Sequence, residues 1–236
     1  MNRQAQAVIM LLFGGAILKA SLGDLYLRYV KAGLQPFLIG AGLLLVAAGA
    51  MTLWYELRPR PAPEDEHGHH HEPRVGWLLI LPVLGLLLVA PPALGSYAAG
   101  QAGSVLSAQT SDSDYPALEA GDPVDVGLLD YASRAVFDEG RSLTGRTVRL
   151  TGFVAAGPDG EPMLARMVMS CCAADGRPIK VGLAGDGPTG LAPDTWVQVV
   201  GGYTERVGKD PVNGAVVPYL QVQSWQEITA PKQQYE

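Results

Sequence analysis

Residues 36–54 read PFLIGAGLLLVAAGAMTLW and contain no charged side chain. An α-helix of this length is about 28 Å long, close to the roughly 30 Å thickness of the hydrocarbon core of a bilayer. The stretch therefore predicts a membrane-spanning helix and decides the fold class of the N-terminal part of the chain. Two further windows have the same character, namely Ala5–Leu22, which is interrupted by Lys19, and the uncharged Gly76–Leu94.

The first window is expected to remain as a helix and not to be removed as a signal peptide. Lys19 stands where a small residue would be needed for cleavage, and another full-length apolar window follows at once. Residues 1–95 are thus predicted to form three transmembrane helices. Small residues such as Gly14 and Gly49 recur in these windows and favour close helix–helix contact.

None of the three windows carries a carboxylate or a histidine. Polar groups at membrane depth are what a transporter uses to handle an ion or a polar substrate. The windows therefore predict an anchor or an accessory bundle in the cell membrane, embedded in the lipid bilayer, and not a translocation path. The distribution of lysine and arginine favours a cytoplasmic N-terminus, which would put the C-terminal domain on the extracytoplasmic side of this multi-pass protein.

Charge separates the two parts of the chain. The 236 residues include 17 Lys and Arg against 23 Asp and Glu, for a formal net charge of −6. Residues 1–95 hold 7 basic and 6 acidic side chains, whereas residues 96–236 hold 10 and 17. A nucleic-acid partner is excluded on this basis, because no basic excess is present to displace the counterions of phosphate groups.

All four histidines lie in the loop predicted at residues 55–75, which contains RPRPAPEDEHGHHHEPR. Imidazole binds Zn²⁺ and other transition-metal ions, and the neighbouring carboxylates add oxygen ligands. The loop predicts weak, exchangeable metal capture, with an ordinary polar loop as the alternative. The candidate ligands are His67, His69, His70 and His71.

A Gly-, Ala-, Ser- and Asp-rich stretch at residues 96–123 predicts a flexible linker. A short helix is expected after it. Asp125 is a plausible N-cap, Leu129 and Val136 are two of its apolar residues at helical spacing, and Gly140 can end it.

The rest of residues 124–236 predicts a soluble, mainly-β domain. Short alternating strands separated by turn residues are typical of a small barrel, and an OB-like barrel is the specific expectation. In place of the usual OB helix between the third and fourth strands the sequence has only GDGPTGLAPD, and the helix precedes the first strand. The predicted strands are Arg146–Ala155, Pro162–Ser170, Pro178–Ala184, Trp196–Tyr203 and Val216–Ile228.

The two cysteines, Cys171 and Cys172, are adjacent in MSCCAAD, at the end of the second predicted strand. Neighbouring residues of a regular strand point to opposite faces, so either the strand breaks there or one cysteine packs in the core. Four interpretations remain open: soft-metal ligation together with Asp175, a strained vicinal disulfide, a reactive thiol, or two small buried side chains.

No enzymatic activity is predicted, and no residue is assigned as catalytic. The C-terminal domain has no histidine to activate a cysteine. The chain also lacks a Gly-rich phosphate loop, a Ser/His/Asp set and a GxSxG motif.

The combination of apolar windows, a histidine-rich loop and four C-terminal motifs resembles a bacterial family of permease subunits, the YcgQ-like proteins. The motifs are LTGRTVRLTGFVA, ARMVMSCCAAD, DTWVQVVGGYTE and ITAPKQQY, and SCCAAD is the most specific of them. Members of this family are typically encoded beside a large multi-spanning permease. The resemblance therefore implies a membrane accessory subunit whose partner is a polytopic permease.

Two functions follow as hypotheses. The first is an accessory subunit of a permease, whose barrel covers or gates the permease or captures a ligand. The second is a membrane-tethered metal-binding or thiol-redox protein that uses the cysteine pair and the histidine loop. The only cofactor that these residues suggest is Zn²⁺ or another transition-metal ion.

Overall fold

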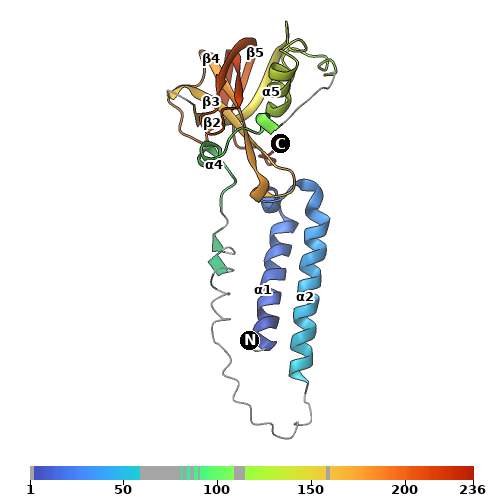
Figure 1. Cartoon of the computed structure of the whole chain (residues 1–236). Coiled ribbons are helices and arrows are strands. Elements are labelled where there is room, and N and C mark those ends of the chain that lie inside the picture. The colour runs from blue at the N-terminus through green and yellow to red at the C-terminus, as the bar shows by residue number, and fades with distance from the viewer. Residues whose placement is uncertain are drawn as a thin grey trace. The chain divides into compact units, whose positions relative to one another are not determined.

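A computed structural model of the chain divides into two compact units, Met1–Pro92 and Ala93–Glu236. Figure 1 labels helices of both units and four strands of the second unit. The residues that the structure describes are 3–58, 81, 84, 85, 88, 89, 91–108, 115–157 and 160–236.

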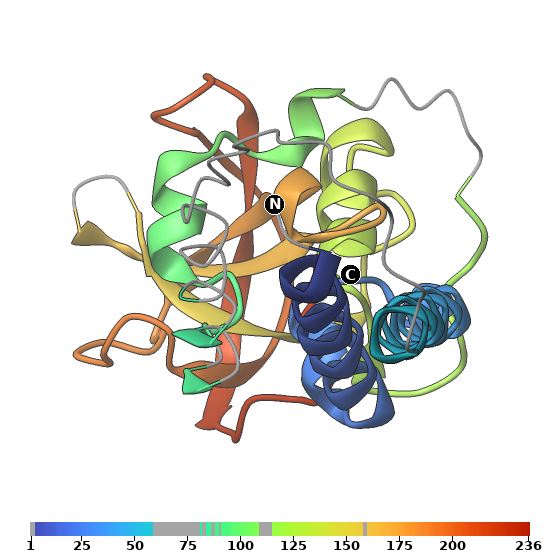
Figure 2. The ribbon, with the colours of Figure 1, turned by 90° about the horizontal axis from the view of Figure 1, so that it is seen from below.

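The N-terminal unit is built on two long helices, α1 (Arg3–Leu22) and α2 (Gln35–Leu57). Two short 3₁₀ turns join them, η1 (Asp24–Arg28) and η2 (Ala32–Leu34), so the helices run side by side (Figures 1 and 2).

Glycines lie where α1 and α2 touch. A Cβ on Gly14 would lie 2.8 Å from the Val46 side chain, and one on Gly49 would lie 3.0 Å from the backbone oxygen of Ala7. The helix–helix contact expected from the small residues is therefore confirmed.

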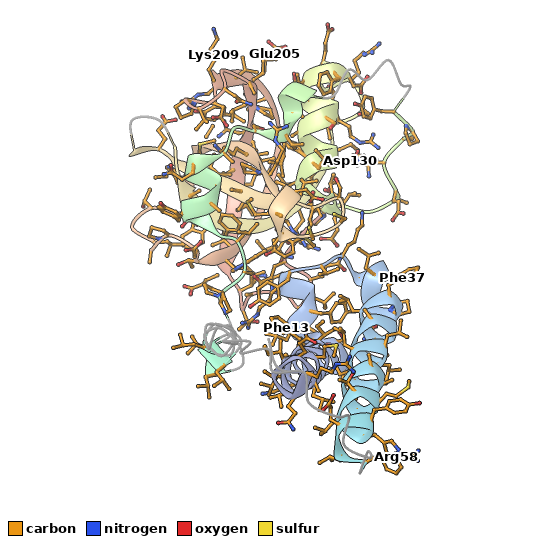
Figure 3. The ribbon with its side chains drawn as sticks, turned by 60° about the horizontal axis from the view of Figure 1, so that its bottom comes forward. Phe13, Phe37, Arg58, Asp130, Glu205 and Lys209 are labelled. Carbon is orange, nitrogen blue, oxygen red and sulfur yellow. The ribbon has the colours of Figure 1, made fainter. Side chains whose placement is uncertain are left out.

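Two described helical stretches, Arg3–Leu22 and Ala32–Leu57, are long and apolar enough to cross a membrane by length and composition. They coincide with the first two predicted windows. Most of the third window, Gly76–Leu94, lies outside the described residues, so three spans are not shown. Large apolar side chains remain exposed on the helix pair, among them Phe13 and Phe37, which are labelled in Figure 3.

The C-terminal unit contains a closed barrel of five strands, compatible with the predicted small barrel. Each of the five pairs with two others of the barrel, in the circular order β2, β3, β4, β6, β5 and back to β2. All of these pairs are antiparallel except β4–β6, which is parallel. The strands are β2 (Thr147–Ala156), β3 (Pro162–Val168), β4 (Arg177–Gly185), β5 (Trp196–Lys209) and β6 (Val216–Glu227).

One helix, α5 (Leu128–Phe137), packs on the barrel core. Its Tyr131 is fully buried and donates a hydrogen bond of 2.7 Å to the backbone oxygen of Tyr219 in β6. Gly140 has a φ of +70° and its N–H donates to the backbone oxygen of Arg134 at 3.0 Å, so the chain leaves the helix at the predicted glycine.

The predicted N-cap of this helix is wrong. Asp125 lies in β1 (Val124–Asp125), a two-residue strand that pairs in parallel with β2, and its carboxylate contacts Arg149 at 3.2 Å. The helix begins after Gly127, which has no side chain to offer. The first free N–H groups of the helix, those of Leu128 and Leu129, donate instead to the carboxylate of Glu236, each at 2.8 Å.

The stretch predicted as a linker starts with two short helices, α4 (Ser96–Gln101) and η4 (Val105–Ala108). Ala99 of α4 is fully buried in a second apolar cluster with Phe153 of β2 and Met167 of β3. Along β2, Leu150 and Val154 belong to the main core, while Phe153 and Ala155 belong to this second cluster. The alternation of a strand thus gives β2 two apolar faces, one of which is covered by α4.

Candidate metal site at the Cys171–Cys172 turn

The chain leaves regular strand geometry before it reaches the cysteines. β3 ends at Val168, and a short 3₁₀ helix, η6 (Ala173–Asp175), leads from the cysteines into β4. Cys171 is exposed, Cys172 is half-buried, and both are free thiols. The break in the strand is therefore the correct alternative, and the interpretation of the pair as buried core packing is wrong.

Asp175 holds this turn together through the backbone. Its carboxylate accepts hydrogen bonds from the N–H groups of Ser170 at 2.9 Å and of Cys171 at 2.8 Å, with the N–H of Cys172 farther away at 3.5 Å. In return, the N–H of Asp175 is within reach of the Cys172 side chain, which completes a capping box. A residue three positions after Cys172 thus sets the conformation of both cysteines.

The turn brings the two thiols to the same side. Cys171 Sγ lies 3.5 Å from Cys172 Sγ. Both sulfur atoms and one carboxylate oxygen of Asp175 lie within 4.8 Å of one another. Three of the seven predicted ligands, Cys171, Cys172 and Asp175, are therefore gathered at one place.

The other four predicted ligands are the histidines of the loop at residues 55–75. His67, His69, His70 and His71 lie outside the described residues.

The carboxylate controls the protonation of the neighbouring thiol. A hydrogen bond with Asp175, and then one with Cys172, raise the pKa of the Cys171 thiol to about 12. The same thiol, together with the backbone N–H of Cys171, lowers the pKa of the Asp175 carboxyl. Cys171 is consequently protonated at neutral pH, which disfavours a reactive thiolate. A metal ion would have to replace that proton.

A close contact supports the turn at Gly176. A Cβ at this position would lie 2.7 Å from Cδ1 of Leu94, so a side chain between η6 and β4 would displace the Leu94 side chain. The N–H of Leu94 in turn donates a hydrogen bond of 2.9 Å to the hydroxyl of Tyr235, which is buried. The cysteine turn therefore rests on the first residues of the C-terminal unit and on the last ones.

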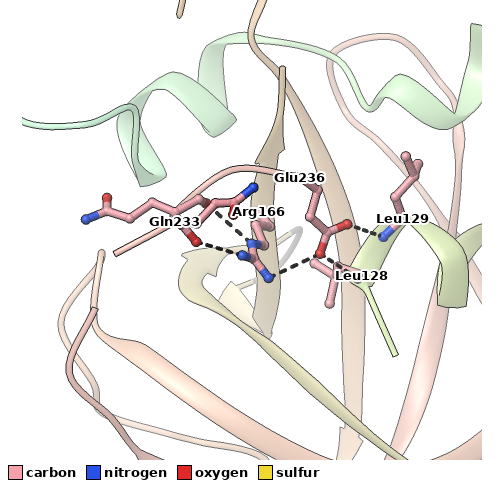
Figure 4. A network of polar contacts seen from close by, with 6 residues as sticks. Leu128, Leu129, Arg166, Gln233 and Glu236 are labelled. Atoms are coloured by element: carbon pink, nitrogen blue, oxygen red, sulfur yellow. Dashed lines mark hydrogen bonds and ion pairs between the residues drawn. The ribbon is translucent and has the colours of Figure 1, made fainter. Parts of the chain in front are cut away.

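Sequence reasoning missed a second polar centre, shown in Figure 4. Arg166 donates to the backbone oxygen of Gln233 at 2.9 Å and pairs with the Glu236 carboxylate at 3.4 Å. Glu236 is the residue that caps α5, and its backbone N–H bonds to Met167. We call Arg166, Gln233 and Glu236 the tail network.

A shallow cavity of about 720 Å³ lies beside the tail network, lined among others by Tyr115, Asp130 and Arg166. The one signal in the sequence that could have pointed here was the ITAPKQQY motif, which by itself says nothing about its contacts.

One protein-family model matches most of the C-terminal unit. Residues 134–236 match the family model of the DUF1980 C-terminal domain. The DUF1980 match includes the five barrel strands, the cysteine turn and the tail network, and that bacterial family has no known function. The chain matches no curated protein and no solved structure. The DUF1980 match names no permease, so the permease-subunit expectation remains a prediction.

Proposed function

We propose that this protein is a membrane-tethered metal-binding protein whose barrel captures a thiophilic transition-metal ion at the Cys171–Cys172 turn. A single observation carries the proposal: two thiol sulfurs and a carboxylate oxygen lie within 4.8 Å of one another on an accessible turn. Soft sulfur ligands with an added oxygen are a donor set that transition-metal ions take up readily.

Pre-organisation of the turn supports this function. The backbone hydrogen bonds to Asp175 already hold the two thiols on one side, so binding needs little rearrangement of the chain. Because Cys171 is exposed, an ion can reach the sulfur atoms directly.

A thiol-redox role has less support. Disulfide exchange starts with attack by a thiolate, and the hydrogen bond to Asp175 keeps Cys171 protonated at neutral pH. A bound metal ion, in contrast, supplies the positive charge that would let the thiol lose its proton.

The tether is the second element of the proposal. Support comes from α1 and α2, which have the length and composition of membrane spans. The proposed arrangement is a multi-pass anchor in the cell membrane, with the barrel on the extracytoplasmic side. The strand order and the single parallel pair, β4–β6, support an OB-like assignment for this barrel.

An accessory role beside a polytopic permease is the second candidate. It is favoured by the apolar side chains that the α1–α2 pair leaves exposed, such as Leu44 and Trp54 at 73% and 62%. Lipid or the helices of a partner could cover them. In this version the barrel would capture the ion for the permease, so the two candidates are compatible.

Metal titration of the full-length protein in mild detergent tests the proposal. The background is removed first with a four-histidine variant, in which His67, His69, His70 and His71 are replaced by Asn. We expect this variant to retain one equivalent of tightly bound Zn²⁺, and to lose it when Cys171→Ser and Cys172→Ser are added. A four-histidine variant that is folded and binds no metal would refute metal capture at the turn.

Co-purification tests the accessory role. The affinity tag belongs at the N-terminus, because Tyr235 is buried and Glu236 caps α5. We expect a single polytopic permease to be recovered from native membranes at near-stoichiometric yield. Recovery of this protein without such a partner would leave the membrane helices as an anchor only.

A further inference from the structure

The separation of the two sulfur atoms distinguishes among thiophilic ions. With metal–sulfur bonds of about 2.3 Å, the observed 3.5 Å between Cys171 Sγ and Cys172 Sγ corresponds to an angle at the metal of about 100°. This angle is near the roughly 109° of a tetrahedral site. A linear arrangement of two thiolates around one ion would need sulfur atoms about 4.6 Å apart, twice the same bond length.

A wider separation would require the cysteine side chains to rotate. Cys171 and Cys172 are adjacent, and the carboxylate of Asp175 holds the N–H groups on this turn. Each cysteine can then adjust only by rotation about its own Cα–Cβ bond. A linear ion would have to drive the thiols apart, whereas a tetrahedral ion fits between them almost as they stand.

Asp175 can act as a ligand without releasing the turn. Its Oδ1 accepts one N–H, that of Ser170, and its Oδ2 accepts that of Cys171 as the nearest one. A carboxylate oxygen has two lone-pair sites, so Oδ1 keeps one lone pair for a metal ion. The turn thus offers three donors, two sulfurs and one oxygen.

Three donors leave one tetrahedral position open. Structural zinc sites are closed by four protein ligands, while sites that act on or exchange a ligand keep the fourth position for water or an incoming group. Since Cys171 is exposed, that position is accessible from solvent.

We propose, on the basis of the metal capture proposed above, that the Cys171–Cys172 turn is an open tetrahedral site for Zn²⁺, with Asp175 as its third ligand. The site holds one ion through three protein ligands and exchanges it through the fourth position. It prefers ions that bind two thiolates at a bent angle over Cu⁺, which binds them linearly.

Cobalt substitution in the full-length four-histidine variant tests the geometry. Bound Co²⁺ is expected to show the intense visible bands of a tetrahedral site together with thiolate-to-cobalt charge transfer, and Zn²⁺ is expected to displace it. The weak bands of six-coordinate Co²⁺ would overturn the proposed geometry while leaving metal capture intact. If neither ion binds, the geometry and the proposed function fail together.

The role of Asp175 has its own variant and control. We expect Asp175→Asn to lower Zn²⁺ affinity roughly 10- to 100-fold while the charge-transfer bands persist. Asp186→Asn, which changes an exposed acidic residue of the same domain, is expected to leave affinity unchanged. Thermal unfolding of both metal-free variants checks that the barrel is folded. Equal affinities of a folded Asp175→Asn variant and the parent would remove Asp175 from the ligand set.

Competition with other thiophiles tests the preference. Cu⁺ and a trivalent arsenical, phenylarsine oxide, are added separately to the Zn²⁺-loaded protein. We expect Zn²⁺ to stay bound at one equivalent of Cu⁺. Displacement by Cu⁺ with an X-ray absorption spectrum of two collinear sulfurs would refute the bent site. Capture of the arsenical by a protein that takes up no Zn²⁺ would identify the turn as a dithiol trap and refute the zinc proposal.

Discussion

The cysteine turn and the tail network lie in the same unit but are built in opposite ways. The hydrogen bonds that shape the turn lie within residues 170–175 and run between positions at most five apart. The tail network joins Arg166 to Glu236 and joins Glu236 to α5, across separations of 70 and 108 residues. The comparison suggests that the chemistry of this domain is local, while its stability depends on contacts between distant segments.

The largest effect is expected at another long-range polar contact, the buried ion pair between Lys180 and Asp210. Their charged atoms lie 2.8 Å apart and both side chains are buried. Asp210→Asn leaves the Lys180 ammonium without its counter-charge, which costs about 3 kcal/mol. Urea unfolding of the full-length protein measures this loss, and Asp186→Asn, at an exposed acidic residue of the same domain, is a control expected to cost far less. Equal losses of unfolding free energy in the two variants would show that the buried ion pair does not stabilise the fold.

The same pair predicts acid sensitivity. Burial alone would raise the pKa of the Asp210 carboxyl, but hydrogen bonds from Lys180 and Val212 outweigh it, and the folded-state pKa is lowered. A lowered pKa contributes stability that is present above the unfolded value of about 3.9 and is lost as the pH falls through the folded value. Urea midpoints of the parent should therefore drop below about pH 4 more steeply than those of Asp210→Asn. If the urea midpoints of the two proteins fell in parallel with pH, the lowered pKa of Asp210 would be contradicted.

A smaller loss is expected in the tail network. Arg166→Ala removes the donor of the bonds to Gln233 and Glu236, and the half-buried carboxylate loses its counter-charge. We expect urea unfolding to show a loss of about 2 kcal/mol in the free energy of unfolding. Glu236→Ala, which removes only the cap of α5 and the ion pair, should cost about 1 kcal/mol. If Arg166→Ala also abolished metal binding, the two regions would not be independent.

A change in thiol reactivity is expected at the turn itself. Because the Asp175 carboxylate raises the pKa of Cys171 to about 12, alkylation of Cys171 by iodoacetamide should be slow near neutral pH and should accelerate as the pH rises. Asp175→Asn should make the reaction several-fold faster, as followed by peptide mass spectrometry. An unchanged rate in this variant would show that the carboxylate does not govern the thiol.

The smallest effect on stability is expected from the cysteines. Replacing Cys171 and Cys172 by Ser alters an exposed and a half-buried side chain, so the free energy of unfolding should change by no more than about 0.5 kcal/mol. Metal binding in the four-histidine variant should nevertheless be lost. A large loss of stability would mean that the thiols contribute to packing, and the contrast with the tail network would disappear.

Much of the fold was predictable from short-range patterns. The apolar windows predicted α1 and α2, and the alternation of residues such as Val148, Leu150 and Val154 predicted the strands of a small barrel. These signals are readable because a helix or strand that buries one face repeats its apolar residues with its own period. The proposed metal ligands at the cysteine turn were predictable as a cluster for a similar reason, since the three lie within five residues of one another.

What sequence alone could not decide were the partners of distant residues. Asp125 was the obvious local N-cap of α5, yet Glu236 caps this helix, because the barrel brings the end of the chain to it. In the same way, residues 96–101 have the composition of a linker but form α4 over an apolar face of β2.

By itself, then, the sequence determined the long apolar helices, the five strands of the barrel and the residues that cluster at the cysteine turn, because each depends on residues close together in the chain. Only the tertiary structure decided that the strand breaks before Cys171, that the barrel closes through β2 and β5, and that the two thiols lie on one side of the turn. These features depend on free energies gained by groups that meet only after folding, and no local pattern records them.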